Sequence, residues 1–99
     1  MSDDTHSTGR FVLQGRLDAD TVAAVEVRLL EAVAGTAHLL VVDASALDYI
    51  SSAGIRAVLT AVKRMRAKGG GLCITDMRKG VREVLELTGM TALLAPPPA

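Results

Sequence analysis

Short apolar runs alternate along this chain with amphipathic stretches. Each run is followed within two residues by a glycine or an aspartate, a pattern that predicts buried strands at residues 11–13, 39–42 and 72–74. In the stretches that follow, apolar residues recur every three or four positions. This spacing predicts helices at residues 22–33, 52–68 and 77–88. A last apolar pair, at 93–94, predicts one more short strand before three prolines.

The order strand, helix, strand, helix, strand, helix predicts an α/β fold with parallel pairing through right-handed crossovers. The run at 39–42 is apolar at every position, which is typical of a central strand covered on both faces. We interpret 44–51 as a connection, with Ser52 as the N-cap of the helix that follows. Asp18 and Asp20 are further candidate helix caps, and Asp76 is the candidate cap of the third helix.

The composition limits which classes of protein this chain can belong to. The chain has 99 residues, 49% of them hydrophobic and 2% aromatic, which predicts one aliphatic core. The formal net charge of +0 argues against direct nucleic-acid binding, which favours a basic excess. With Cys73 as the single cysteine, neither a disulfide nor a cysteine metal cluster is expected. No run is long enough to span a membrane and the first residues are polar, so we expect a cytoplasmic protein without cofactor or metal.

Two hydroxyls mark the most informative segment. Ser51 and Ser52 stand where a strand turns into a helix, and Gly54 follows closely. The simplest interpretation is that the serines cap the helix, with the Ser52 oxygen accepting from the amide of Gly54 or Ile55. Gly54 would keep the first helical turn bare, so that the surface of a partner can approach it.

The same serines raise the question of nucleophilic catalysis. A nucleophile elbow needs glycine two residues before the serine, and Ile50 occupies that position. The only available general bases are His6, near the chain start, and His38, at the start of a strand. A serine without a base is a poor nucleophile, so we do not expect an enzyme, although a minimal serine hydrolase stays as an alternative.

Several segments resemble one known family. Tyr49-Ile50-Ser51-Ser52-Ala53-Gly54-Ile55-Arg56 is similar to the phosphorylation-site motif of STAS-domain anti-sigma-factor antagonists. Three further segments match this family in order and spacing, and the resemblance covers roughly residues 10 to 94. They are Gly15-Arg16-Leu17-Asp18, Leu40-Val41-Val42-Asp43, and the closing half, which contains 66–74 and 81–90.

The resemblance implies a fold and a site. The fold would be a four- to five-stranded, mostly parallel sheet with three to four helices, spanning 10–95. A tail or short edge strand would precede it at 1–9, and a proline-rich tail would follow at 96–99. The phosphorylated residue would be Ser52, with Ser51 as the alternate, because the family often has aspartate at that preceding position. The implied partner-binding residues are Asp18, Ile50, Ser51, Ser52, Ala53, Gly54 and Arg56.

The resemblance also implies partners. A GHKL-type serine kinase that doubles as an anti-sigma factor would bind the unmodified protein and release the sigma factor. A PP2C-type phosphatase would reverse the modification. Neither nucleic acid nor membrane would be contacted, and the protein would be a monomer or a weak homodimer. The closest alternative is a STAS subunit of a lipid-transport ATPase complex, which co-purification with a transporter ATPase rather than a kinase would reveal.

Overall fold

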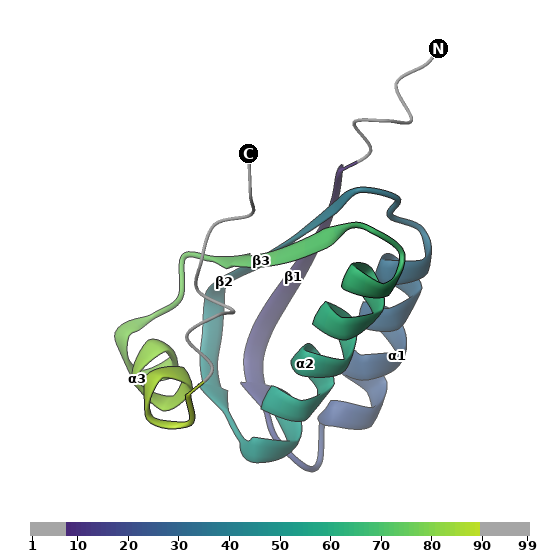
Figure 1. Cartoon of the computed structure of the whole chain (residues 1–99). Helices are drawn as coiled ribbons and strands as arrows, with labels where there is room; N and C mark the ends of the chain where they lie inside the picture. Colours follow the sequence, from purple (N-terminus) through teal and green to yellow (C-terminus); the bar gives the residue numbers. More distant parts are fainter. Residues whose placement is uncertain (1–7, 90–99) are drawn as a thin grey trace.

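The structure is a computed structural model, and residues 8–89 are described. A parallel sheet carries two helices on one face and a third at its other side (Figure 1). The elements follow the predicted order. They are β1 (Thr8–Leu17), α1 (Val22–Ala34), β2 (Leu39–Ile50), α2 (Ser52–Ala67), β3 (Gly71–Thr75) and α3 (Lys79–Leu87). The α/β alternation is therefore confirmed.

The sheet of the described residues has the order β1-β2-β3, and both pairings are parallel. The prediction that 39–42 lies in the central strand is confirmed. The face of this strand that packs against α1 and α2 is fully covered, since Leu40 and Val42 are fully buried. The opposite face is only partly covered, since Val41 is half-buried. The additional strand predicted at 93–94 lies outside the described residues.

The core fills the space between the sheet and the pair α1 and α2. Each helix contributes the apolar positions that its spacing placed on one face, which are Leu29 and Val33 from α1 and Ile55, Val58, Val62 and Met65 from α2. Val22, Val25 and Leu59, which the same helical spacing places on these faces, are only half-buried. The Lys68 ammonium donates to the carbonyl of Val33, so the end of α2 is tied to the last turn of α1.

The predicted connection at 44–51 is wrong, because β2 continues to Ile50. Val12 pairs with Asp43 and Gln14 with Ala46, so β2 holds an extra residue there, and a second shift follows between Gly15 and Arg16. These bulges keep Leu47 in the core while the apolar and polar alternation is broken. The pattern therefore looked irregular although the backbone remains a strand.

The third helix also begins differently from the prediction. Its N-cap is Arg78, and Asp76 instead adopts a positive φ of 59° in the turn after β3. Aspartate is among the few residues that tolerate this conformation. At the other end, Gly89 has a φ of 76° and its amide donates to the Glu86 carbonyl, as predicted for a glycine that closes a helix.

Candidate functional site

The carboxyl ends of β1 and β2 meet at one edge of the sheet, where α1 and α2 begin (Figure 1). Leu17 and Ile50 are register partners, and the Ser51 amide donates to the Leu17 carbonyl at 2.9 Å. The turn 18–21 therefore lies beside the serine pair. Parallel pairing is what brings the two distant segments to a common edge.

Ser51, not Ser52, is the N-cap of α2. Its backbone is extended, with φ −98° and ψ 175°, and its Oγ accepts from the Gly54 amide at 3.3 Å. Its carbonyl accepts the first intrahelical bond, from the Ile55 amide at 2.9 Å. The predicted cap at Ser52 is thus wrong by one residue, because β2 extends to Ile50 and leaves only Ser51 in the nonhelical position that a cap requires.

Ser52 is the first helical residue, and its side chain is exposed. Its hydroxyl has no hydrogen-bond partner among residues 8–89. The helix geometry leaves the amides of Ser52 and Ala53 without an intrahelical acceptor, and the helix dipole places partial positive charge at this end. Arg56 lies four residues later on the same helix face, and it is exposed too. The surroundings of the Ser52 hydroxyl therefore favour an anion.

Two of the predicted contact residues lie beneath this surface. Ile50 is 3% exposed, and Gly54 is buried. A Cβ on Gly54 would lie 2.8 Å from Leu17 Cγ and 2.9 Å from the Leu17 carbonyl oxygen. The glycine is needed because α2 packs closely on the end of β1, so the expectation that it leaves room for a partner is corrected. Of the remaining predicted contacts, Ser52 and Arg56 are exposed.

Asp18 organises the turn beside the serines. The sequence predicted Asp18 as a helix cap, but the N-cap of α1 is Thr21. Its Oδ1 instead accepts from the amides of Asp20 at 3.0 Å and Thr21 at 3.2 Å, while its Oδ2 lies 3.4 Å from the Arg16 Nε. Desolvation by itself would raise the pKa of Asp18, but these hydrogen bonds together outweigh it, so the pKa is lowered.

The lowered pKa of Asp18 predicts a loss of stability in acid. A carboxyl whose pKa is lower in the folded state stabilises the fold above its unfolded pKa of about 3.9, and this contribution disappears as pH falls further. The pKa of Asp43 is lowered as well, chiefly by the Ser45 backbone hydrogen bond. We expect urea unfolding at about pH 3 to show a smaller gap between the native chain and Asp18→Asn than at about pH 7. An equal gap at both values would contradict this assignment.

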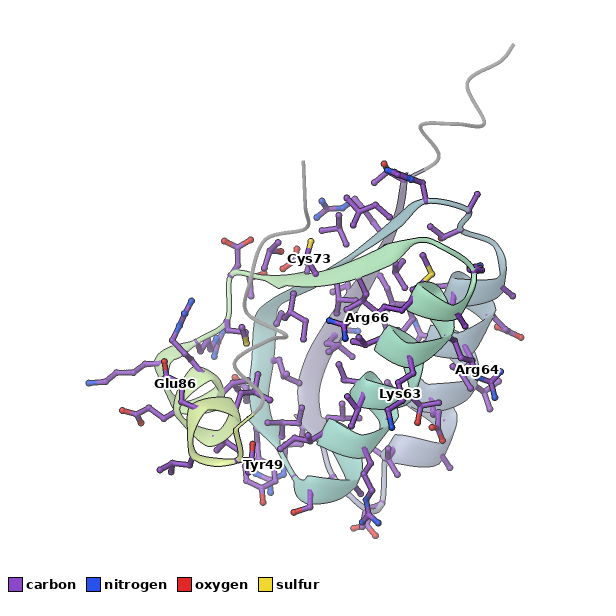
Figure 2. All side chains as sticks on the ribbon, in the orientation of Figure 1. Tyr49, Lys63, Arg64, Arg66, Cys73 and Glu86 are labelled. Carbon is purple, nitrogen blue, oxygen red and sulfur yellow. The ribbon has the colours of Figure 1, made fainter. Side chains whose placement is uncertain are left out.

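Sequence reasoning missed several residues around this edge. The Arg16 guanidinium lies 4.3 Å from the centroid of the Tyr49 ring, which is 40% exposed. Figure 2 shows Tyr49 at the end of β2 where α2 begins. Arg78 pairs with Asp48 and donates to the Ser45 carbonyl at 3.0 Å. The signal was available only in part, since Arg16 and Tyr49 both belong to segments that resemble the family, but their contact depends on strand register.

A small pocket adjoins Tyr49. It has a volume of about 130 Å³ and lies between the end of β2 and the start of α3. Its lining residues are Asp48, Tyr49, Ile50, Gly80, Val81 and Val84. The carboxyl-end surface, defined here by the exposed parts of Arg16, Asp18, Tyr49, Ser52 and Arg56, thus combines an aromatic ring, charges of both signs and a hydroxyl.

Among residues 8–89, no histidine lies at this surface to serve as the base of a serine hydrolase. His38 is the only histidine within 8–89, and it precedes β2, whereas Ser52 follows the end of that twelve-residue strand. The two residues therefore lie at opposite ends of the sheet.

Among the described helices, none is both long and apolar enough to cross a membrane.

Comparisons with known proteins agree with this geometry. The STAS domain family model matches residues 3–97. A protein of Bordetella bronchiseptica named "Putative anti-sigma factor antagonist BtrV" is 36% identical over 81 residues, which cover 82% of this chain and 70% of that protein. The structure of the anti-sigma factor antagonist SpoIIAA in its unphosphorylated form is similar in fold, with a TM-score of 0.76 and 20% identity. That match covers 93% of this chain and 81% of SpoIIAA.

Proposed function

This chain belongs to the STAS domain family and is an anti-sigma factor antagonist, and we propose that phosphorylation of Ser52 switches its binding to an anti-sigma factor. The observation that carries the proposal is that the two serines have different structural roles. Ser51 Oγ is engaged as the helix cap, whereas the neighbouring Ser52 hydroxyl is exposed at the positive end of α2. Ser52 can therefore accept a phosphate while Ser51 Oγ keeps its capping hydrogen bond to the Gly54 amide.

Phosphorylation at Ser52 is compatible with the fold. The phosphate adds about −1.5 to −2 charge. The free amides at the start of α2 and the helix dipole stabilise an anion there by about 0.3–1 kcal/mol. Arg56, one turn further, supplies a full positive charge on the same face. The modified protein is therefore expected to remain folded, and the switch needs no conformational change.

The same phosphate is incompatible with a docked partner. A partner that covers the carboxyl-end surface would have to bury the phosphate, which carries a desolvation cost, and any partner carboxylate nearby would be repelled. The unmodified protein would bind the anti-sigma factor, a GHKL-type serine kinase, and free the sigma factor. Phosphorylation by that kinase would end binding, and a PP2C-type phosphatase would restore it in the cytoplasm.

Mass spectrometry tests the assignment directly. The chain is incubated with its cognate kinase and ATP, and the intact mass and the modified peptide are determined. We expect one phosphate on Ser52, none on Ser52→Ala, and continued modification of Ser51→Ala. Modification of Ser52→Ala to the same extent as the native chain would overturn the assignment, and recovery of phosphate at Ser51 alone would transfer it to that residue.

A further inference from the structure

The outer face of α2 carries positive charge only. Four basic residues project from it, all of them exposed, and the helix contains no acidic residue. These residues, Arg56, Lys63, Arg64 and Arg66, are called here the basic face of α2. Figure 2 shows Lys63 at the front of the helix, with Arg64 and Arg66 on either side of it. The helices α1 and α3 each contain residues of both signs.

The charge of this face is not neutralised within the molecule. The three ion pairs among residues 8–89 lie on the strands and their turns, and none involves α2. Outside 8–89 the sequence has only two acidic side chains, Asp3 and Asp4, which are fewer than the four basic residues of the face. The chain has eleven residues of each sign, so seven basic and eleven acidic residues lie elsewhere. The basic face is therefore a local excess on an otherwise acidic molecule.

The basic face is continuous with the carboxyl-end surface, because Arg56 belongs to both. Ser52, Arg56 and Lys63 are four and seven residues apart, which places them in one row along a helix of 3.6 residues per turn. This row is about 17 Å long. A partner that covers Ser52 through a typical interface, with about 800 Å² on each side, has to extend beyond the carboxyl-end surface. The basic face is an exposed surface onto which it can extend.

The sign of the proposed switch indicates the sign of the partner. A phosphate on Ser52 would strengthen the binding of a basic surface, because charge-assisted hydrogen bonds would form. It opposes the binding of an acidic surface, both by repulsion and because Arg56, one turn away, would then pair with the phosphate. A phosphate that ends binding therefore calls for an acidic partner at this place, and such a partner is complementary to the basic face.

We propose that the basic face of α2 binds an acidic surface of the anti-sigma factor, an inference that rests on the proposed function. Exposed ion pairs add little to affinity but accelerate encounter, so the face acts mainly on the association rate. Nucleic acid and anionic lipid would attract the same face. Both are negative over an area larger than the face, however, and they would repel the acidic remainder of the chain.

Charge reversal on two helices tests the proposal. Arg66→Glu changes the basic face, and Arg82→Glu makes the same substitution at an exposed position of α3. Surface plasmon resonance with the purified cognate anti-sigma factor measures the association rate constant. At about 0.05 M NaCl we expect Arg66→Glu to lower this constant about fivefold or more, and Arg82→Glu to change it less than about twofold. Lys63→Glu should act as Arg66→Glu does, and circular dichroism checks that each variant is folded.

Salt separates a steering charge from a structural effect. At about 0.5 M NaCl the Debye length is about 4 Å, so the native chain and Arg66→Glu should associate at rates within about twofold of each other. A difference that persists at this salt concentration overturns the proposal, and so does equal slowing by Arg66→Glu and Arg82→Glu. Binding to phosphatidylserine vesicles that Arg66→Glu abolishes, with the rate toward the anti-sigma factor unchanged, overturns it in favour of a membrane.

The Ser52→Asp variant separates this proposal from the switch. If Arg66→Glu associates as fast as the native chain while Ser52→Asp binds weakly, the basic face has no role and the switch at Ser52 stands. If Arg66→Glu is slow but Ser52→Asp binds as the native chain does, the switch fails and the basic face remains the docking surface. A native chain that does not bind the anti-sigma factor overturns both.

Discussion

Ser52→Asp is expected to weaken binding to the cognate anti-sigma factor about 100-fold, equivalent to about 3 kcal/mol, while the protein stays folded. The carboxylate stands at the start of α2, where the helix dipole stabilises it, so the fold tolerates the charge. In the complex the same carboxylate must be desolvated, and no positively charged group of the anti-sigma factor is positioned to pair with it. Isothermal titration calorimetry with the purified anti-sigma factor measures the difference.

The neighbouring serine provides the matched control. Ser51→Asp adds the same charge one residue earlier, where aspartate is as good an N-cap as serine, and its carboxylate is committed to the Gly54 amide. We expect Ser51→Asp to bind within a few-fold of the native chain, and Ser52→Ala to bind as the native chain does. If Ser51→Asp and Ser52→Asp lost affinity equally, general charge rather than the position of Ser52 would control binding.

Gly54→Ala is expected to lower the free energy of unfolding by about 2 kcal/mol. The added methyl would lie 2.8 Å from Leu17 Cγ, which can adjust, and 2.9 Å from the Leu17 carbonyl oxygen, which cannot. That oxygen is held in place because it accepts from the Ser51 amide. Relief of the contact requires the start of α2 to move away from β1, which would displace both serines from their positions.

Gly80→Ala is the control for this prediction. Gly80 is also a helical glycine, but a Cβ there would have no atom within 4 Å, so the better helix propensity of alanine should leave stability unchanged or raise it by about 0.5–1 kcal/mol. Urea unfolding followed by circular dichroism compares the two variants. A Gly54→Ala variant as stable as Gly80→Ala would show that the close packing of α2 on Leu17 does not constrain position 54.

Local patterns in the sequence were sufficient for the element order and most of the core. The spacing of Leu29 and Val33, or of Val58 and Val62, reflects the helical period itself, which depends only on near neighbours along the chain. The glycine at 89 closes α3 for an equally local reason. The extension of β2 was missed because two bulges, which depend on pairing with β1, interrupt its alternation.

The sequence by itself determined that two hydroxyls stand at the junction of β2 and α2, next to a glycine. Only the tertiary structure decided their roles. The Leu17 carbonyl accepts from the Ser51 amide, so Ser51 is held in the capping position and Ser52 is left exposed as the first helical residue. The same strand end makes Gly54 an inward contact rather than an outward one. These assignments depend on the register of β1 on β2, which joins residues far apart in the chain.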